Sequence, residues 1–424
     1  MSSTQEQSSS KTMRNMLIAL CAIMLGTQLP MILSPLGAYI VRDYPNIDPT
    51  FAISIVSTPR MFGGLISIVL LAPLMLKANR KILGQLFLVI YIAFAVTFYT
   101  VGKMNGPFMA MYGMAFIVGI PAGGYTILCT TIISENYSES KDRLKLIGRY
   151  QAFGAAAYMI MLFISGRLAS RNDGYAWPDA FLLGILPLIG LVVWSAFLPK
   201  ETAVAKRSDK EPVKFSWKAF TPGIIMMAAL YLLFYCSQNV YNSCVSQWVI
   251  TERAVGTAAD AADATMIGRF VLMGIGLGQP LFVKYLGKWQ IPIGGAFTLT
   301  ACILLYVGQT LPILFLASVC LNIGTGLSNY GVNGYCYEVA RPGYGPIAVS
   351  VMTMMMMSGG TVTPFLISWF SPVFGGGFNG KLASGILFAS LLLVGNILFY
   401  TTKNRFRYPN YEKVETTAKE EKFI

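Results

Sequence analysis

The sequence predicts an all-helical membrane protein with twelve transmembrane helices arranged in two six-helix halves. Of its 424 residues, 55% are hydrophobic and 12% are charged, whereas an ordinary soluble domain carries about 25% charged residues. The mean hydropathy is +0.58. The charged residues also fall at intervals that leave apolar segments of about 20 residues, the length that crosses a bilayer. The longest charged segment between these apolar segments, residues 200–218, lies near the middle of the chain.

The gaps between charges define each predicted span, because a charge inside the hydrocarbon costs several kcal/mol. The first half contains spans at 17–40, 51–76, 82–102, 107–134, 150–166 and 180–199. The second half contains spans at 220–250, 264–283, two within 289–337 separated by the turn 308–312, and 346–370 and 382–402. The predicted organisation is a tail (1–13), a bundle (14–199), a linker (200–218), a bundle (219–403) and a tail (404–424).

The distribution of lysine and arginine predicts the orientation. Cytoplasmic loops of membrane proteins carry an excess of these residues. With both termini inside, the inner segments hold 24 of them, the outer loops hold six, and Arg60 and Arg269 lie within spans, which accounts for all 32. We therefore expect a multi-pass protein of the cell membrane with both termini cytoplasmic. The first span has no AxA cleavage pattern, so it is predicted to be retained.

Composition excludes several functional classes. The sequence has no histidine, which removes imidazole metal ligands and Ser-His or Cys-His nucleophile pairs. Its seven cysteines lie in apolar segments without a CxxC spacing. A primary pump is excluded because there is no GxxxxGK[ST] loop. We expect no catalytic residues, metal or cofactor, no nucleic-acid partner despite the net charge of +13, and a monomer in the lipid bilayer.

The two halves share an internal pattern. In the second span of each half a lone arginine follows a helix-loosening residue, at Pro59-Arg60 and at Gly268-Arg269. A basic turn comes 15 to 20 residues later, at 77–81 and 284–288. In the fourth spans, 119–123 (GIPAG) and 322–326 (NIGTG) stand at the same distance from Glu135 and Glu338. Each glutamate is followed by an arginine, Arg143 or Arg341.

This arrangement resembles the major facilitator superfamily, whose members pair two six-helix bundles about a pseudo-two-fold axis with a substrate site between them. The family's loop between helices 2 and 3 usually reads GxLaDrxGRr, and residues 72–81 read APLMLKANRK. The basic end is kept, and Leu76 stands where the family has aspartate. The resemblance disfavours the drug/proton antiporter branch, because the fourth span has no arginine and 154–158 reads GAAAY in place of GPxxGG.

Arg60 and Arg269 are the main candidates for substrate binding. An arginine inside a membrane span cannot lose its proton and needs an anionic partner, and the spans contain no carboxylate at that depth. A bound carboxylate, sulfonate or phosphate would supply the charge. The resemblance agrees, because family porters of nitrate, oxalate and organic phosphates use paired basic residues. In the alternative interpretation, Arg60 pairs with Asp43 or Asp48, and Arg269 with Asp260 or Asp263, as an extracellular gate.

Polar side chains within spans extend the predicted site. The additional substrate-binding candidates are Gln28, Tyr235, Gln238, Asn239, Asn329 and Asn333, because polar groups within a span suit a wet cavity. Alternatively, these groups form hydrogen bonds between helices. The predicted gating residues, at helix ends, are Glu135, Arg143, Arg149, Glu338 and Arg341.

Together these features predict a secondary transporter that moves a small anionic solute, such as an organic carboxylate, by alternating access. The alternative is an efflux pump of the same family for drug-like or other non-anionic molecules. A cation pump needs a carboxylate that titrates inside the membrane, and the spans offer none. A membrane-embedded enzyme would need clustered His, Asp or Cys near one interface, which the sequence does not show.

Overall fold

The computed structural model describes residues 2–75, 79–136, 140–198, 220–340 and 345–401. It separates into two compact units. Unit 1 comprises Met1–Ser208, Asn242–Phe270 and Gln309–Leu311, and unit 2 comprises the rest of the chain. Boundaries between the units fall inside three helices, α10, α11 and α14, so unit 1 combines the predicted first bundle with pieces of the second.

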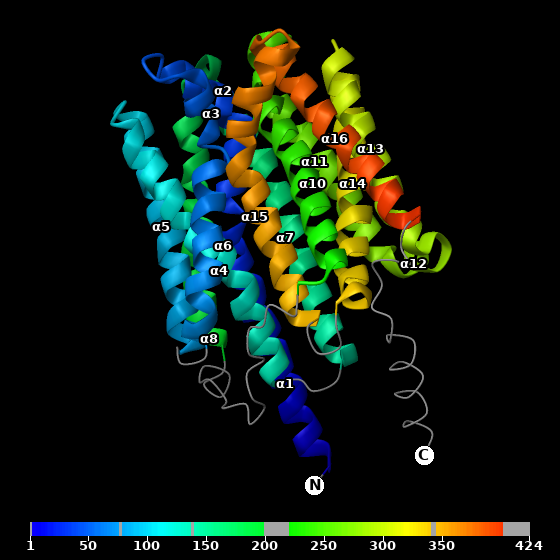
Figure 1. Ribbon diagram of the computed structural model, residues 1–424. Helices are drawn as coiled ribbons and strands as arrows, with labels where there is room; N and C mark the ends of the chain where they lie inside the picture. Colours follow the sequence, from blue (N-terminus) through cyan, green and yellow to red (C-terminus); the bar gives the residue numbers. More distant parts are fainter. Residues whose placement is uncertain (1, 76–78, 137–139, 199–219, 341–344, 402–424) are drawn as a thin grey trace. The chain divides into compact units, whose positions relative to one another are not determined.

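All regular secondary structure in the described residues is helical (Figure 1). Those wholly in unit 1 are α1 (Ser2–Thr27), η1 (Leu29–Ile32), α2 (Leu33–Asp43), α3 (Pro49–Ser54), α4 (Thr58–Met75), α5 (Arg80–Lys103), α6 (Phe108–Asn136), α7 (Ser140–Ala169), η2 (Arg171–Gly174), η3 (Trp177–Gly184), α8 (Ile185–Phe197) and η5 (Trp248–Glu252). The helices divided between the units are α10 (Pro222–Gln247), α11 (Ala258–Leu277) and α14 (Leu311–Val339). Those in unit 2 are α12 (Gln279–Leu286), η6 (Gly287–Trp289), α13 (Gln290–Val307), α15 (Gly345–Phe370), η7 (Ser371–Phe374) and α16 (Gly377–Thr401).

Ten helical segments in the described ranges are long and apolar enough to cross a membrane. The other two predicted spans, 51–76 and 264–283, are each divided into two helices. A turn at 55–57 separates α3 from α4, and Gly278 separates α11 from α12. Each second helix carries a proline in its first turn, Pro59 or Pro280. Proline has no backbone N–H to give to a preceding turn, so it begins a helix more readily than it continues one.

The structure places two helix starts earlier than the sequence predicts. The helix α1 begins at Ser2, so residues 2–13, predicted as a tail, are helical. The helix α11 begins at Ala258, before the predicted start of its span at residue 264. Its first turn contains Asp260, whose carboxylate accepts the Thr257 N–H at 2.7 Å. A side-chain oxygen that satisfies a free N–H at a helix start stabilises that start, which explains why charged residues belong to the helix.

The helices α4 and α6 make the most extensive helix–helix contact of unit 1 (Figure 1). The two helices approach through glycines. A Cβ atom on Gly63 would collide with the carbonyl oxygen of Phe116, and one on Gly123 would collide with Ser67. Small residues let helix backbones approach each other in membranes. The pair is therefore fixed by backbone packing, and it positions Arg60 near the start of α4.

Unit 2 uses the same principle at another pair of helices. Gly294 of α13 lies against Gly324 and Ser328 of α14, and a side chain on either glycine would collide with its neighbour. The helices α13 and α16 also lie side by side (Figure 1). The apolar core of this unit includes Phe234 of α10.

Candidate functional site

Arg60 lies in the interior of unit 1, with only 6% of its surface exposed. It follows Pro59 in the first turn of α4. It interacts electrostatically with four residues from other helices: Tyr158 of α7, Tyr91 of α5, Tyr125 of α6 and Arg269 of α11. Three tyrosines and a second arginine thus interact electrostatically with this buried guanidinium.

Gly119 of α6 fixes the backbone of Arg60. A Cβ atom at this position would collide with the carbonyl oxygen of Arg60 and would lie 2.8 Å from the Cα atom of Gly63. Only glycine permits this approach. The position of Arg60 is thus set by its own backbone and not only by contacts of its long side chain.

Arg269 belongs to the part of α11 that lies in unit 1. Its guanidinium carbon is 5.3 Å from the ring centroid of Tyr158, a cation–π contact. Its Nε atom is buried and has no hydrogen-bond partner among the described residues. Within the described residues, no carboxylate forms an ion pair with Arg60 or Arg269. The structure therefore brings these two arginines into one electrostatic neighbourhood around Tyr158.

Tyrosines complete this neighbourhood, and the sequence analysis did not select them. Tyr158 is 5% exposed. Tyr91 is fully buried, its ring packs against Gly26 of α1, and its hydroxyl has no hydrogen-bond partner in the part of the chain that the structure describes. A buried hydroxyl without a partner costs free energy unless a water or a ligand satisfies it. We define the Arg60 site as Arg60, Arg269, Tyr91, Tyr125 and Tyr158.

Gln28, at the start of η1, lies beside Thr27. Its Nε2 atom donates to the Thr27 hydroxyl at 3.2 Å. A Cβ atom on Gly154 of α7 would lie 3.5 Å from the same Nε2 atom. Gln28 therefore contacts the helix that carries Tyr158.

The other predicted substrate-binding residues belong to unit 2. The hydroxyls of Tyr231 and Tyr235 donate to Oδ1 of Asn329 at 2.9 and 3.3 Å. Gln238 donates through Nε2 to the Thr325 hydroxyl at 3.2 Å. Within unit 2 these bonds join α10 to α14, which agrees with the alternative that these polar groups form hydrogen bonds between helices.

Asn239, by contrast, bonds within its own helix. Asn239 donates to the Tyr235 carbonyl of its own helix at 2.7 Å. Asn333 lies on α14, and its side chain is outside the described set.

The predicted inner gating residues are mostly outside the described side chains. Glu135, Arg143 and Glu338 lie on α6, α7 and α14, with only their backbone described. Arg341 lies outside the described residues. Arg149 is exposed on α7. Their gating role stays a prediction.

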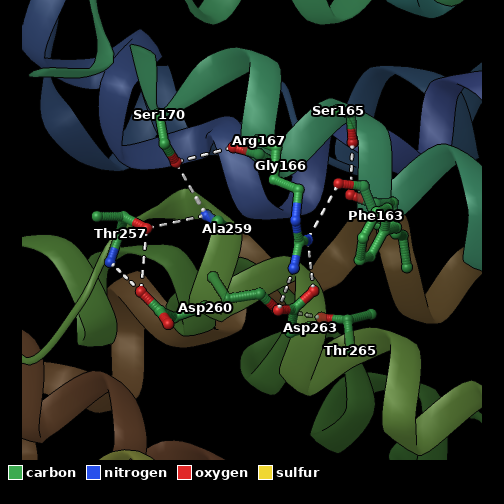
Figure 2. Close-up of polar contacts among 12 residues, drawn as sticks. Phe163, Ser165, Gly166, Arg167, Ser170, Thr257, Ala259, Asp260, Asp263 and Thr265 are labelled. Atoms are coloured by element: carbon green, nitrogen blue, oxygen red, sulfur yellow. Dashed lines mark hydrogen bonds and ion pairs between the residues drawn. The ribbon is translucent and has the colours of Figure 1, made fainter. Parts of the chain in front are cut away.

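The aspartates considered as partners of the two arginines have other contacts. Asp43 accepts the Trp177 Nε1–H at 2.6 Å, and Asp48 accepts the Phe51 N–H at 2.9 Å. Asp260 binds Thr257 of its own helix start. Asp263 forms an ion pair with Arg167 of α7, at 2.9 Å (Figure 2). The sequence analysis had counted Arg167 only among the outer-loop charges.

The described residues contain no group of three or more His, Cys, Asp or Glu that could hold a metal ion. Positive charge, aromatic rings and hydroxyls make up the candidate site, and its tyrosines lie on three of the helices that are long and apolar enough to cross a membrane. Ten such helices are typical of a polytopic membrane protein. The family model described as the Major Facilitator Superfamily matches residues 16–364. The chain belongs to the major facilitator superfamily.

Solved structures agree with this assignment. A bacterial homologue of the human lysosomal transporter Spinster, in an inward-facing and unoccupied conformation, matches with a TM-score of 0.66 and 13% identity, over 94% of this chain and 98% of its own. A POT peptide transporter in complex with alafosfalin matches with a TM-score of 0.72 and 12% identity, over 94% and 95%. The nucleoside transporter NupG matches with 0.71 and 14%, over 91% and 99%. No curated protein matches the sequence. The protein is a membrane transporter and not an enzyme.

Proposed function

We propose that this transporter carries a small anionic solute, with a carboxylate, sulfonate or phosphate group, by alternating access. The observation that carries the proposal is the pair Arg60 and Arg269, which share one neighbourhood around Tyr158 without a described carboxylate partner. Two like charges in a low-dielectric interior repel each other more strongly than in water. An anion between them would remove this repulsion and accept hydrogen bonds from both guanidinium groups.

The tyrosines favour an anion for a second reason. A phenolic hydroxyl can donate a hydrogen bond, and the Tyr91 hydroxyl has no hydrogen-bond partner among the described residues. A ring such as that of Tyr158 also holds a guanidinium through its face without neutralising it. The site is therefore positive and rich in donors, whereas a site for a cation would need carboxylates, and no described carboxylate pairs with either arginine.

A ligand panel tests the substrate class. Purified protein is titrated calorimetrically with mono- and dicarboxylates, sulfonates and inorganic phosphate or sulfate, each matched to a neutral amide or a cationic amine of the same size. We expect binding of one or more anions and none of their neutral analogues. Equal binding of the neutral or cationic compounds would favour the alternative, an efflux pump for non-anionic molecules. Uptake into liposomes with and without a proton gradient identifies the coupling.

We also propose that both termini and the linker 200–218 are cytoplasmic, because of the 24-to-6 distribution of lysine and arginine. Under this orientation the turns after α2, α5 and α7 face the outside, and we call this end of unit 1 the predicted outer end. Reporter fusions after Asp209 and after Ile424 should both give a cytoplasmic signal. A periplasmic or extracellular signal from either fusion would contradict the orientation.

A further inference from the structure

The helices α7 and α11 cross closely at the predicted outer end of unit 1 (Figure 2). Gly166 of α7 makes the crossing possible. A Cβ atom on it would lie 2.7 Å from Cβ of Ala262 and 3.0 Å from Cα of Ala259. The two helices come from different predicted halves of the chain, so this crossing joins the halves within unit 1.

An ion pair closes the crossing. Arg167 binds Asp263 through two parallel hydrogen bonds, Nη1 to Oδ1 at 2.9 Å and Nη2 to Oδ2 at 3.0 Å (Figure 2). The guanidinium carbon also lies 3.5 Å from the ring centroid of Phe163. This bidentate geometry is the most specific one that arginine and a carboxylate can make. The side chains are 44% and 26% exposed, so water can reach the pair when it opens.

Hydrogen bonds from α7 and α2 hold the first turn of α11. The Ser170 hydroxyl accepts the Ala259 N–H at 3.0 Å and donates to the Gly166 carbonyl at 2.8 Å (Figure 2). The Tyr39 hydroxyl accepts the Ala258 N–H at 3.4 Å. These backbone N–H groups have no acceptor within their own helix. The neighbouring helices thus supply partners for both groups, and the Ala259 N–H also lies 3.2 Å from the Thr257 hydroxyl. A separation of α7 from α11 would break the bond from the Ala259 N–H to Ser170.

A buried apolar cluster, which we call the Leu162 layer, reaches from the ion pair to Tyr158 of the Arg60 site. Leu162, Ala262 and Tyr158 form one buried cluster, against which Met31 and Met266 pack. On α7, Tyr158 precedes Arg167 by nine residues, about 13 Å of helix at 1.5 Å per residue. Leu162 lies between Arg167 and Tyr158 along α7, and Met266 lies between Asp263 and Arg269 along α11, whereas Ala262 is beside the ion pair.

We propose that the α7–α11 contact is the outer gate above the Arg60 site, with Arg167–Asp263 as its lock and the Leu162 layer as its seal. The proposal rests on alternating access but not on the charge of the solute. The Arg167–Asp263 ion pair is partly exposed, and water can hydrate both side chains when they separate, so the pair can open at modest cost in free energy. The seal is apolar and contains methionine, whose flexible side chain adapts to repacking.

Cysteine accessibility tests the gate without any ligand. Met31→Cys introduces a thiol into the seal, and intact cells are treated with a membrane-impermeant sulfonated maleimide. The parent chain, with its native cysteines, gives the background. Tyr175→Cys, at a position that is 67% exposed at the predicted outer end, shows in every variant that this end faces the reagent.

Asp263→Asn in the Met31→Cys background should raise the labelling rate about fivefold, which corresponds to about 1 kcal/mol in the gate equilibrium. The charge exchange Arg167→Asp with Asp263→Arg should return the rate toward that of Met31→Cys alone. Asp179→Asn is the matched control, because it breaks the Lys103–Asp179 ion pair of 2.7 Å at the same end but within the first predicted half. It should leave the rate unchanged.

An unchanged rate in Asp263→Asn, with Tyr175→Cys labelled and thermal unfolding as in the parent, would overturn the gate. An equal rise in Asp179→Asn would also overturn it, because the effect would then be general loosening. If no anion of the panel bound, the labelling result would still support the gate. If the labelling rate did not change, anion binding would still be supported by the panel. The two proposals are thus separable.

Discussion

Arg60 and Arg269 differ in how the protein holds them, although each follows a helix-loosening residue at a matching place in its half. The backbone carbonyl of Arg60 lies against Gly119 of α6. In the sequence repeat, Asn322 of α14 stands where α6 has Gly119. Asn322 is buried and donates to the Ser318 carbonyl of its own helix at 2.9 Å. A side chain at this position prevents the same backbone approach.

The next glycine of the repeat shows the same difference. Gly123 of α6 lies against backbone atoms of Gly64. Its counterpart Gly326 of α14 lies against the side chains of Ile275 and Leu272, at 2.8 and 3.2 Å for an added Cβ atom. Side chains adjust to a neighbour more easily than backbone does. We infer that the first arginine is a fixed element of the site and the second an adaptable one, held by its Tyr158 contact.

Replacement of each arginine by lysine should give the largest effect and tests this difference directly. Lysine keeps the charge but loses the planar fork. A hydrogen bond to a charged group is worth about 1.5–3 kcal/mol, so we expect about 100-fold weaker anion binding for Arg60→Lys and about 10-fold for Arg269→Lys. Calorimetric titration measures both. Arg171→Lys, at an exposed position in η2, is the control.

Equal affinity losses in the two variants would contradict the distinction between a fixed and an adaptable arginine. Unchanged affinity in both would remove the two residues from the binding site altogether.

Gly119→Ala should come next in size. The new methyl group would push α6 away from the Arg60 carbonyl, and overpacking of this kind costs about 1–3 kcal/mol. We expect a lower midpoint of thermal unfolding in detergent together with weaker anion binding. Gly113→Ala is a matched control in the same helix, because a Cβ atom there meets nothing within 4 Å. It should be neutral or stabilising, since alanine is the better helix former.

Gly326→Ala sharpens the comparison, because its neighbours are side chains. Its unfolding midpoint should lie between those of the two α6 variants. A midpoint as low as that of Gly119→Ala would show that α11 and α14 are as tightly fixed as α4 and α6.

Substitution of Tyr158 should give the smallest effect. The cation–π contact with Arg269 is worth about 0.5–2 kcal/mol, so Tyr158→Leu should weaken anion binding several-fold. Tyr158→Phe keeps the ring and should retain most of the affinity. If both variants lose the same affinity, the hydroxyl and not the ring face carries the contribution. Titration of the same anion into the Tyr158 variants combined with Arg269→Lys measures the coupling between Tyr158 and Arg269.

Charge spacing predicted the helical membrane fold, and the resemblance of the two repeated halves indicated the family; the helices and the family match confirm them. The breaks in the two spans that carry the arginines were not predicted. A proline within an apolar segment is compatible with either a kinked helix or two helices. Likewise, nothing in the composition of residues 2–13 predicted that α1 extends through them.

The electrostatic neighbourhood of Arg60 was only partly predictable. The arginines were visible as isolated charges in apolar segments. Tyr91, Tyr125 and Tyr158 were not, because an aromatic residue in a span faces lipid, protein or a cavity with no difference in the sequence. The Arg167–Asp263 pair was hidden for another reason. Both residues lie at span ends, where a charge ordinarily reports topology, and only helix packing shows that they meet.

The close packing of α4 and α6 through glycines bears on how stable the protein is in different lipids and detergents. Where Gly119 faces the Arg60 carbonyl, the attraction comes from dispersion and from weak C–H···O contacts between backbones. In a bilayer, lipid tails are as apolar as leucine side chains, so helix association depends on such packing and not on exclusion from water. The α4–α6 pair should therefore persist when the bilayer thickness changes or detergent replaces lipid.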